Sequence, residues 1–144
     1  MSNKLKLIID GEPVPAARPR VTRWGTYTPP KYKAFKSKVE LCYKLKYGNK
    51  QLFERGVPLV AKFHFYRPIQ KGLSKKEHAR RASHEVRATV KPDLDNYIKA
   101  IQDGLKASWF DDGQVTDYIV SKDYDEHPRT EILIEEWKKD EENK

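Results

Sequence analysis

Apolar and polar residues alternate along several stretches of the chain, which is the pattern of half-buried β-strands. In the first stretch, Leu5, Leu7 and Ile9 fall on one face and polar residues on the other. The stretches with this period are residues 4–10, 57–68, 114–124 and 129–137. The last two are separated by a short turn that ends at Pro128. Four strands are therefore predicted.

Elsewhere the apolar residues recur at the spacing of a helix. Tyr32, Phe35, Val39 and Cys42 follow this period within residues 28–48, with Pro30 suited to a first helical turn and Gly48 to the end. A second helix is predicted to start at Asp93, because Pro92 disfavours helix at the preceding residue. Its apolar stripe is Leu94, Ile98, Ile101 and Leu105.

These elements predict one α+β domain spanning residues 1–144, in the order β-α-β-(α)-α-β-β, with a small mixed sheet flanked by helices. The bracketed helix belongs to a basic flap at residues 69–90, where Ser74 and Glu77 match a capping box. Residues 138–144 are predicted to be a disordered tail. After the first strand, Pro13, Pro15 and Pro19 predict an extended arm at residues 11–20, and Trp24-Gly25 indicates a turn beyond it.

Composition indicates the compartment. No apolar run approaches the roughly 20 residues of a membrane span, and the first ten residues lack the apolar core of a secretion signal. The single cysteine, Cys42, excludes an intrachain disulfide. We therefore expect a cytoplasmic protein with no membrane partner.

Charge is divided unevenly along the chain, whose formal net charge is +8. Residues 1–92 contain 22 Lys and Arg and 6 Asp and Glu, a net charge of +16. Residues 93–144 contain 7 and 15 respectively, a net charge of −8. A basic segment of this size favours a polyanionic partner such as nucleic acid, because binding releases counterions. The alternative is a lysine-rich surface that is simply solvated.

The acidic residues cluster at two points. Asp93 and Asp95 stand at the start of the second predicted helix, and their carboxylates can converge only if Asp93 lies at the cap or on the extended chain that leads into the helix. Taken alone, this pair favours a structural interpretation. Asp93 would cap the helix, worth about 1 kcal/mol, and Asp95 would pair with Lys99 for about 0.3–0.5 kcal/mol.

The second acidic pair, Asp111 and Asp112, changes that balance. Three carboxylates brought to about 4 Å repel by roughly 4 kcal/mol per pair at an effective dielectric constant of 20. A divalent cation removes this penalty, and ligands that are all oxygen favour Mg²⁺ or Mn²⁺. Such a cation activates water for phosphodiester hydrolysis, and Lys99 is placed to neutralise the transition state. The alternative is that Asp111 and Asp112 only form a polar turn.

The segment KPDLDNYIKAIQDGL, followed by WFDDGQVTDYIVSK, closely resembles the RusA family of Holliday junction resolvases, especially its phage and prophage members. The resemblance spans residues 5–136 and includes the Pro/Arg-rich arm. It implies a Mg²⁺-dependent homodimeric endonuclease that nicks four-way DNA junctions symmetrically and leaves ligatable ends. Two other functions remain open: a nuclease for other branched or single-stranded DNA, and a non-catalytic DNA-binding recombination accessory.

The resemblance also implies roles for individual residues. The catalytic, metal-binding carboxylates are Asp93, Asp95 and Asp112, and Lys99 is the helix lysine needed for cleavage. Supporting positions are Asp111, Asn96 and Asp103. Pro92 stands where the family has a basic residue, with Lys91 one place earlier.

Contacts with DNA are expected from basic and aromatic residues. The predicted phosphate-binding residues are Arg18, Arg20, Arg23 and Lys91. Trp24, Tyr27 and Tyr32 are candidates for stacking on unpaired bases, with packing in the core or in a dimer interface as the alternative.

Overall fold

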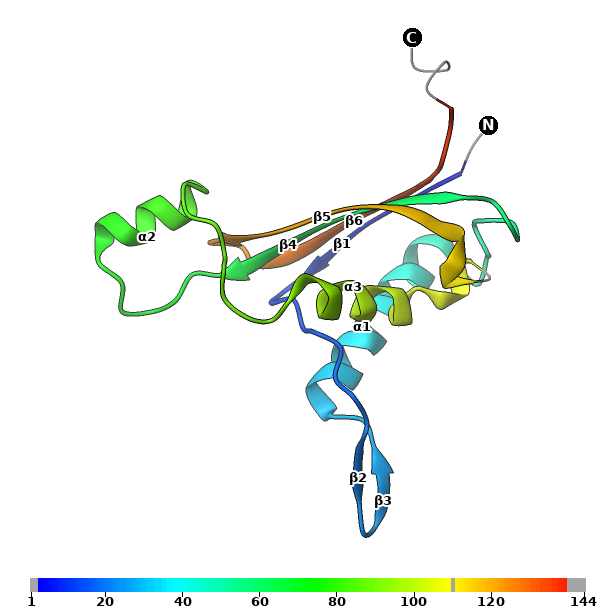
Figure 1. The fold of residues 1–144 in the computed structure, drawn as a ribbon, viewed down its shortest axis with the longest axis horizontal. Helices are drawn as coiled ribbons and strands as arrows, with labels where there is room; N and C mark the ends of the chain where they lie inside the picture. Colours follow the sequence, from blue (N-terminus) through cyan, green and yellow to red (C-terminus); the bar gives the residue numbers. More distant parts are fainter. Residues whose placement is uncertain (1–2, 110, 140–144) are drawn as a thin grey trace.

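The computed structural model describes residues 3–109 and 111–139. Four strands form one sheet in the order β1 (Lys4–Asp10), β6 (Arg129–Glu136), β4 (Leu59–Pro68) and β5 (Val115–Asp125) (Figure 1). The pairs β1–β6 and β6–β4 are antiparallel, whereas β4–β5 is parallel. All four alternating stretches are therefore strands, and the predicted α+β fold with a mixed sheet is confirmed.

The parallel pair determines where the acidic helix lies. A parallel connection needs a crossover from the end of one strand back to the start of the next. Here the crossover contains α2 (Lys75–Ala82) and α3 (Leu94–Gly104). Because α3 runs back along the sheet, its first turn lies near the end of β4 and its last turn near the start of β5 (Figure 1).

Two helices, α1 (Pro30–Tyr47) and α3, cover one face of the sheet (Figure 1). They approach closely at Gly104, where a Cβ atom would lie 2.7 Å from the Cβ of Val39. The buried stripe of α1 includes Tyr32, Phe35 and Val39 as predicted, but Tyr43 is buried more deeply than Cys42.

The buried stripe of α3 agrees with the predicted one only in part. Ile101 and Leu105 are fully buried as predicted, but Tyr97, Ala100 and Gly104 are buried as well. Leu94 and Ile98 pack only partly against the core. The large ring of Tyr97 turns this side of α3 inward, because it stacks on Phe65 of β4 with ring centroids 4.8 Å apart.

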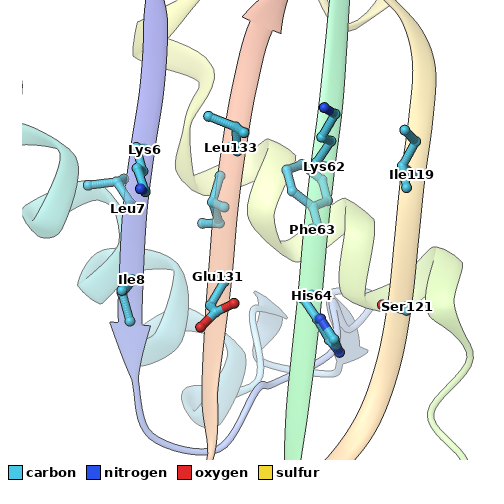
Figure 2. Close-up of a pocket in the computed structure, with 11 residues that line it drawn as sticks. Lys6, Leu7, Ile8, Lys62, Phe63, His64, Ile119, Ser121, Glu131 and Leu133 are labelled. Carbon is cyan, nitrogen blue, oxygen red and sulfur yellow. The ribbon is translucent and has the colours of Figure 1, made fainter.

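The opposite face of the sheet carries no helix, as the view in Figure 2 shows. It mixes apolar and charged side chains over a shallow hollow of about 480 Å³. Ile8 and Ile119 are more than half exposed there. Glu131 and Lys62 lie on the two strands between them, and Lys6 lies beside Ile8 on β1 (Figure 2).

Residues 12–19 of the Pro/Arg-rich arm contain no helix, as predicted, and a hairpin follows them around the predicted turn. Arg20–Thr22 (β2) and Gly25–Tyr27 (β3) pair as a short antiparallel hairpin. The turn at Trp24-Gly25 reverses the chain after β2, and Gly25 has a φ of +126°, which favours glycine. The hairpin projects away from the sheet on the side of α1 and α3 (Figure 1).

The basic flap folds as predicted around a short helix. The Ser74 hydroxyl accepts a hydrogen bond from the Glu77 amide at 3.1 Å and caps α2. The flap is fastened to the end of β5, where Arg87 pairs with Asp123 at 3.0 Å and His84 with Asp125 at 3.1 Å. Of the predicted tail, residues 140–144 lie outside the described residues. Within the described part of the chain, no helix has the length and apolar character to cross a membrane.

Candidate active site

Asp93 and Asp95 stand at the mouth of α3. Asp93 occupies the N-cap with extended backbone angles, φ −71° and ψ 153°, and Asp95 lies in the first turn. The Asp93 carboxylate makes no capping hydrogen bond to the helix. Both side chains are exposed, and neither takes part in a hydrogen bond or ion pair among the described residues. The structure thus does not support the structural interpretation, in which Asp93 caps the helix and Asp95 forms an ion pair with Lys99. Both carboxylates are available for a ligand.

The backbone leading into Asp93 is held from β5. The Lys122 ammonium donates hydrogen bonds to the carbonyl oxygens of Val90 at 2.6 Å and Pro92 at 2.9 Å. The peptide bond between Lys91 and Pro92 is cis. Lys122 therefore binds the two carbonyls on either side of Lys91 and ties the start of α3 to the sheet.

Two cavities flank the first turns of α3. The first, of about 390 Å³, is lined by Asp93 together with Arg67, Lys31 and Lys91. The second, of about 530 Å³, lies between the arm, α1 and α3 and is lined by Lys99 and other cations. Asn96 borders both cavities, and its backbone oxygen accepts a hydrogen bond of 2.9 Å from the Ala16 amide, which seats the arm on α3.

Lys99 faces the arm and α1. Its cavity contains three further cations, Arg18, Lys33 and Lys36. A groove with this charge suits a backbone phosphate. Asp103, on the same cavity wall, accepts a hydrogen bond from the Tyr32 hydroxyl. Burial and then this bond raise the pKa of Tyr32 above its ordinary value. Asp103 therefore fastens α1 to α3.

The aromatic candidates divide into buried and exposed residues. Tyr32 is only 6% exposed, so the core alternative is correct for it. Trp24 is 88% exposed at the tip of the hairpin, and Tyr27 on β3 is 47% exposed. The Arg23 guanidinium lies 5.7 Å from the centroid of the Trp24 ring. An exposed indole beside an arginine is available for stacking on a base.

The second acidic pair lies beyond the far end of α3. Asp112 begins a short 3-10 helix, η2 (Asp112–Gln114), and its Oδ1 accepts a hydrogen bond from the Trp109 indole at 3.2 Å. Burial and then the charge of Asp112 raise the pKa of Tyr118, whose hydroxyl also accepts a hydrogen bond from Gln102. Asp111 caps η2 by accepting a hydrogen bond of 2.9 Å from the Gly113 amide, as the turn interpretation predicts for this residue.

The three predicted metal ligands are not gathered in one place. Among the described residues, no group of three Asp, Glu, His or Cys side chains is arranged to hold a metal ion. Asp112 lies near Gln102, which is roughly 10 Å along the helix axis from Asp95 at 1.5 Å per residue. Asp93 and Asp95 fit a hard cation as two free carboxylates, whereas Asp112 is bound to Trp109. A three-carboxylate site therefore stays a prediction.

The arm and hairpin concentrate positive charge on the helical side of the molecule. No acidic residue occurs between Glu12 and Glu40, a stretch that includes Arg18, Arg20 and Arg23. All three arginines are exposed, and none of the ion pairs found among the described residues involves them. Together with Lys91 they form the cationic surface expected of a DNA interface.

Arg67 and Lys122 were not among the sequence candidates. Their place at the site depends on the parallel pairing of β4 and β5 and on the crossover through α3. The sequence contains one weak indication that Lys122 has a specific role. It is a charged residue on the face of β5 that otherwise carries Tyr118, Val120 and Tyr124. Arg67 directly precedes Pro68 at the end of an apolar strand, which gives no indication of its neighbours.

Comparison with known proteins is consistent with this arrangement. The family described as endodeoxyribonuclease RusA matches residues 10–135 of the chain. An uncharacterized protein, YqaN of Bacillus subtilis (strain 168), is 38% identical over 141 residues, which cover 92% of this chain and 96% of that protein. The family match includes both acidic pairs, the arm and the flap.

Proposed function

This chain belongs to the endodeoxyribonuclease RusA family, and from that premise we propose that it resolves Holliday junctions by paired symmetric nicks that depend on Mg²⁺. The observation that supports this proposal is the free carboxylate pair at the start of α3. Asp93 and Asp95 are exposed and form no hydrogen bond or ion pair among the described residues, and cationic side chains border Asp93. A metal-dependent phosphodiesterase requires available carboxylates of this kind beside basic side chains.

We assign the cation to Asp93 and Asp95. Asp112 becomes the third ligand only after the segment that carries it moves toward the start of α3, because release of its bond to Trp109 alone does not close a separation of roughly 10 Å. Mg²⁺ is favoured and Mn²⁺ is a substitute, because all of these ligands are oxygens. When bound, the cation supplies an activated water and a sink for charge on the phosphate oxygens. Lys122 holds the backbone of the first aspartate in position, and Lys99 contributes positive charge toward the departing oxygen.

The DNA backbone would follow the arm and hairpin. Arg18, Arg20, Arg23 and Lys91 bind phosphates, and Trp24 and Tyr27 stack on bases that are unpaired at the branch point. Binding through many separated cations does not depend on the metal. Junction binding and junction cutting are therefore separable properties of this protein.

Two symmetric nicks require two identical sites, so the active species is proposed to be a homodimer. The open face of the sheet in Figure 2 is the surface we assign to the second copy. It presents exposed Ile8 and Ile119 with charges of both signs, Lys62 and Glu131 among them. A surface with both charges can pair with itself about a two-fold axis, because each cation can meet an anion of the partner.

Two other functions use the same surface. A nuclease for other branched or single-stranded DNA would cut flaps or single strands at least as fast as junctions. A non-catalytic recombination accessory would bind junctions without cutting them, and Asp95→Asn would change nothing. The free carboxylate pair favours an enzyme over an accessory, since it gives no stabilising contact to the fold.

The decisive experiment is a cleavage assay on a mobile four-way junction, in which both nicks are mapped with and without Mg²⁺. We expect paired nicks at symmetry-related positions in opposing strands, slower cutting of flaps, and no cutting of duplex. Product that needs no divalent cation would contradict the proposed mechanism. Faster cutting of flaps than of junctions would instead favour the first alternative.

A further inference from the structure

We propose, resting on the nuclease function above, that Arg67 binds a backbone phosphate of the cleaved strand, next to the phosphate that is cut. Arg67 ends the inward-facing row of β4, and its side chain borders the cavity that Asp93 also lines. Neither the sequence motifs nor the comparisons assign it a role.

Two of the three guanidinium nitrogens of Arg67 are desolvated without a counter-charge, and the side chain also forms a hydrogen bond with Tyr97. The Nε and Nη1 atoms of Arg67 are buried and have no hydrogen-bond partner among the described residues. None of the ion pairs within the described part of the chain involves this arginine. An arginine stays charged in proteins, so it cannot relieve burial by losing a proton. A buried cation is normally paired, and because none of the ion pairs among the described residues includes Arg67, we infer that its anion comes from outside the chain.

Arg67 is held rigidly beside the site. Its neighbour on the same strand face, Phe65, stacks on Tyr97 of α3, which is 1% exposed. Burial raises the pKa of Tyr97, while the nearby Arg67 acts in the opposite direction. The tyrosine hydroxyl therefore stays protonated and adds a donor to the same wall. A side chain packed in this way loses little conformational entropy when it binds an anion.

The cavity has room for a phosphate group together with part of its nucleotide, and most of its charged residues are basic. Its volume is about 390 Å³, and its walls include three cations, Arg67, Lys31 and Lys91. The acidic residues on the same wall are Glu12 and Asp93. A divalent cation on Asp93 would cancel much of that negative charge and leave the three basic groups unbalanced. The anion that balances them would lie next to the metal, which identifies it as a phosphate adjoining the scissile one.

A different role is that Arg67 only neutralises Asp93 while no metal is bound. In that case its removal would let Mg²⁺ bind more tightly, and the dependence of DNA binding on salt would not change. A phosphate contact has the opposite signature. The salt dependence of binding weakens, and the Mg²⁺ concentration that gives half-maximal activity stays constant.

The first test compares Arg67→Met with Lys138→Met. Both variants lose one positive charge, but residue 138 follows β6 at the other end of the sheet, where Glu136 pairs with Leu59. Junction binding is measured against salt in Ca²⁺, and cutting is measured in Mg²⁺ at saturating protein. We expect Arg67→Met to cut about 10- to 100-fold more slowly, because a misplaced strand reacts poorly. Its plot of log K against log salt should lose about one unit of slope.

The second test locates the phosphate. Junctions with one neutral methylphosphonate at each linkage near the mapped cut are cleaved by wild type and by Arg67→Met. At one linkage adjoining the cut, we expect the methylphosphonate to slow cleavage by the wild-type protein about as much as Arg67→Met slows cleavage of the unmodified junction. The same methylphosphonate should not slow cleavage by Arg67→Met any further. If the rate losses from the methylphosphonate and from Arg67→Met multiply at every linkage tested, the two act independently, and the assignment of a phosphate to Arg67 is wrong.

The remaining outcomes are also decisive. Tighter Mg²⁺ binding by Arg67→Met with an unchanged salt slope would overturn the phosphate contact in favour of charge neutralisation. If Arg67→Met unfolds, Arg67→Lys replaces it in the linkage scan, because it keeps the charge but not the planar donor group. Wild type that cuts no junction would refute the proposed nuclease. If the wild-type protein cuts junctions and Arg67→Met cuts them at the same rate, the proposed role of Arg67 is refuted but the proposed nuclease function is not.

Discussion

Lys122 donates a hydrogen bond of 2.9 Å to the carbonyl oxygen of Pro92, the residue directly before Asp93. It also bonds to the carbonyl of Val90 at 2.6 Å. A lysine on β5 thereby positions the first carboxylate motif, although β5 is the strand that follows the second motif. The two motifs are coupled through this strand even though their carboxylates do not meet.

Replacing this lysine should therefore impair cutting. We expect Lys122→Met to lower the rate of junction cleavage at least tenfold, because the Val90 and Pro92 carbonyls lose their shared donor and the Asp93 backbone is released. Lost hydrogen bonds to a charged group should also lower the free energy of unfolding by about 1.5–3 kcal/mol. Lys138→Met is the control. Cleavage at the wild-type rate, measured in single turnovers, would show that Lys122 has no positioning role.

The carboxylates should control chemistry and not binding. Asp93→Asn, Asp95→Asn and Asp112→Asn are each expected to abolish Mg²⁺-dependent cutting, while junction binding in gel shifts persists. Asp111→Asn is the matched control, because asparagine keeps the oxygen that accepts from the Gly113 amide and should retain activity. Full activity in Asp112→Asn would remove residue 112 from the metal site and leave Asp93 and Asp95 in place.

The hairpin tip should matter only when DNA is present. Trp24 is 88% exposed, so Trp24→Ala should change the free energy of unfolding by less than about 0.5 kcal/mol. Loss of a stacked base should weaken junction binding by about 1–3 kcal/mol, measured by fluorescence anisotropy. Val21, on the same hairpin and 82% exposed, supplies the control Val21→Ala. Equal affinities for both variants and wild type would rule out stacking by Trp24.

The open sheet face should control oligomeric state. Ile119 is 61% exposed on that face, and Ile119→Glu should convert the proposed dimer to a monomer because it would bury an unpaired charge. The control is Leu45→Glu, at an exposed apolar position on α1. Light scattering measures the molar mass of the wild-type protein and of both variants, and thus their oligomeric states. A monomeric wild type would contradict the dimer, and an unaffected Ile119→Glu dimer would move the interface elsewhere.

The attachment of the flap to β5 should depend on pH. Burial tends to raise the pKa of Asp125, but hydrogen bonds from the His127 amide, His84 and Arg129 outweigh it, so the pKa lies below its ordinary value. A carboxyl with a depressed pKa stabilises the fold above its unfolded pKa of about 3.9, and this stabilisation is lost as pH falls through the lower folded value. Asp125→Asn should therefore cost about 1–2 kcal/mol at pH 7.

That difference should shrink steadily below about pH 4, because the wild-type carboxyl then becomes neutral as well. Urea unfolding of both proteins from pH 7 down to pH 3 measures it. A gap that stayed constant over this range would show that the charge of Asp125 does not hold the flap.

Local sequence patterns were sufficient to predict the main helices and strands of the fold. Alternation placed the four strands, and the 3.6-residue period with Pro30 and Gly48 bounded α1. Both signals act over a few residues and need no knowledge of distant contacts. The turn at Trp24-Gly25 was predicted, but the short strands on either side of it were not, because their side chains are all exposed and no buried face imposes a period on β2 or β3.

The sequence by itself determined the helices, the four strands of the main sheet, the family, and the acidic and basic residues on which the proposed chemistry depends. Only the tertiary structure decided which of these residues are neighbours. The parallel pairing of β4 and β5 brings Arg67 and Lys122 to the start of α3, and the length of that helix keeps Asp112 away from Asp95. Periodicity reports which face of an element is buried, but distances between elements depend on crossover and packing that involve residues far apart in the chain.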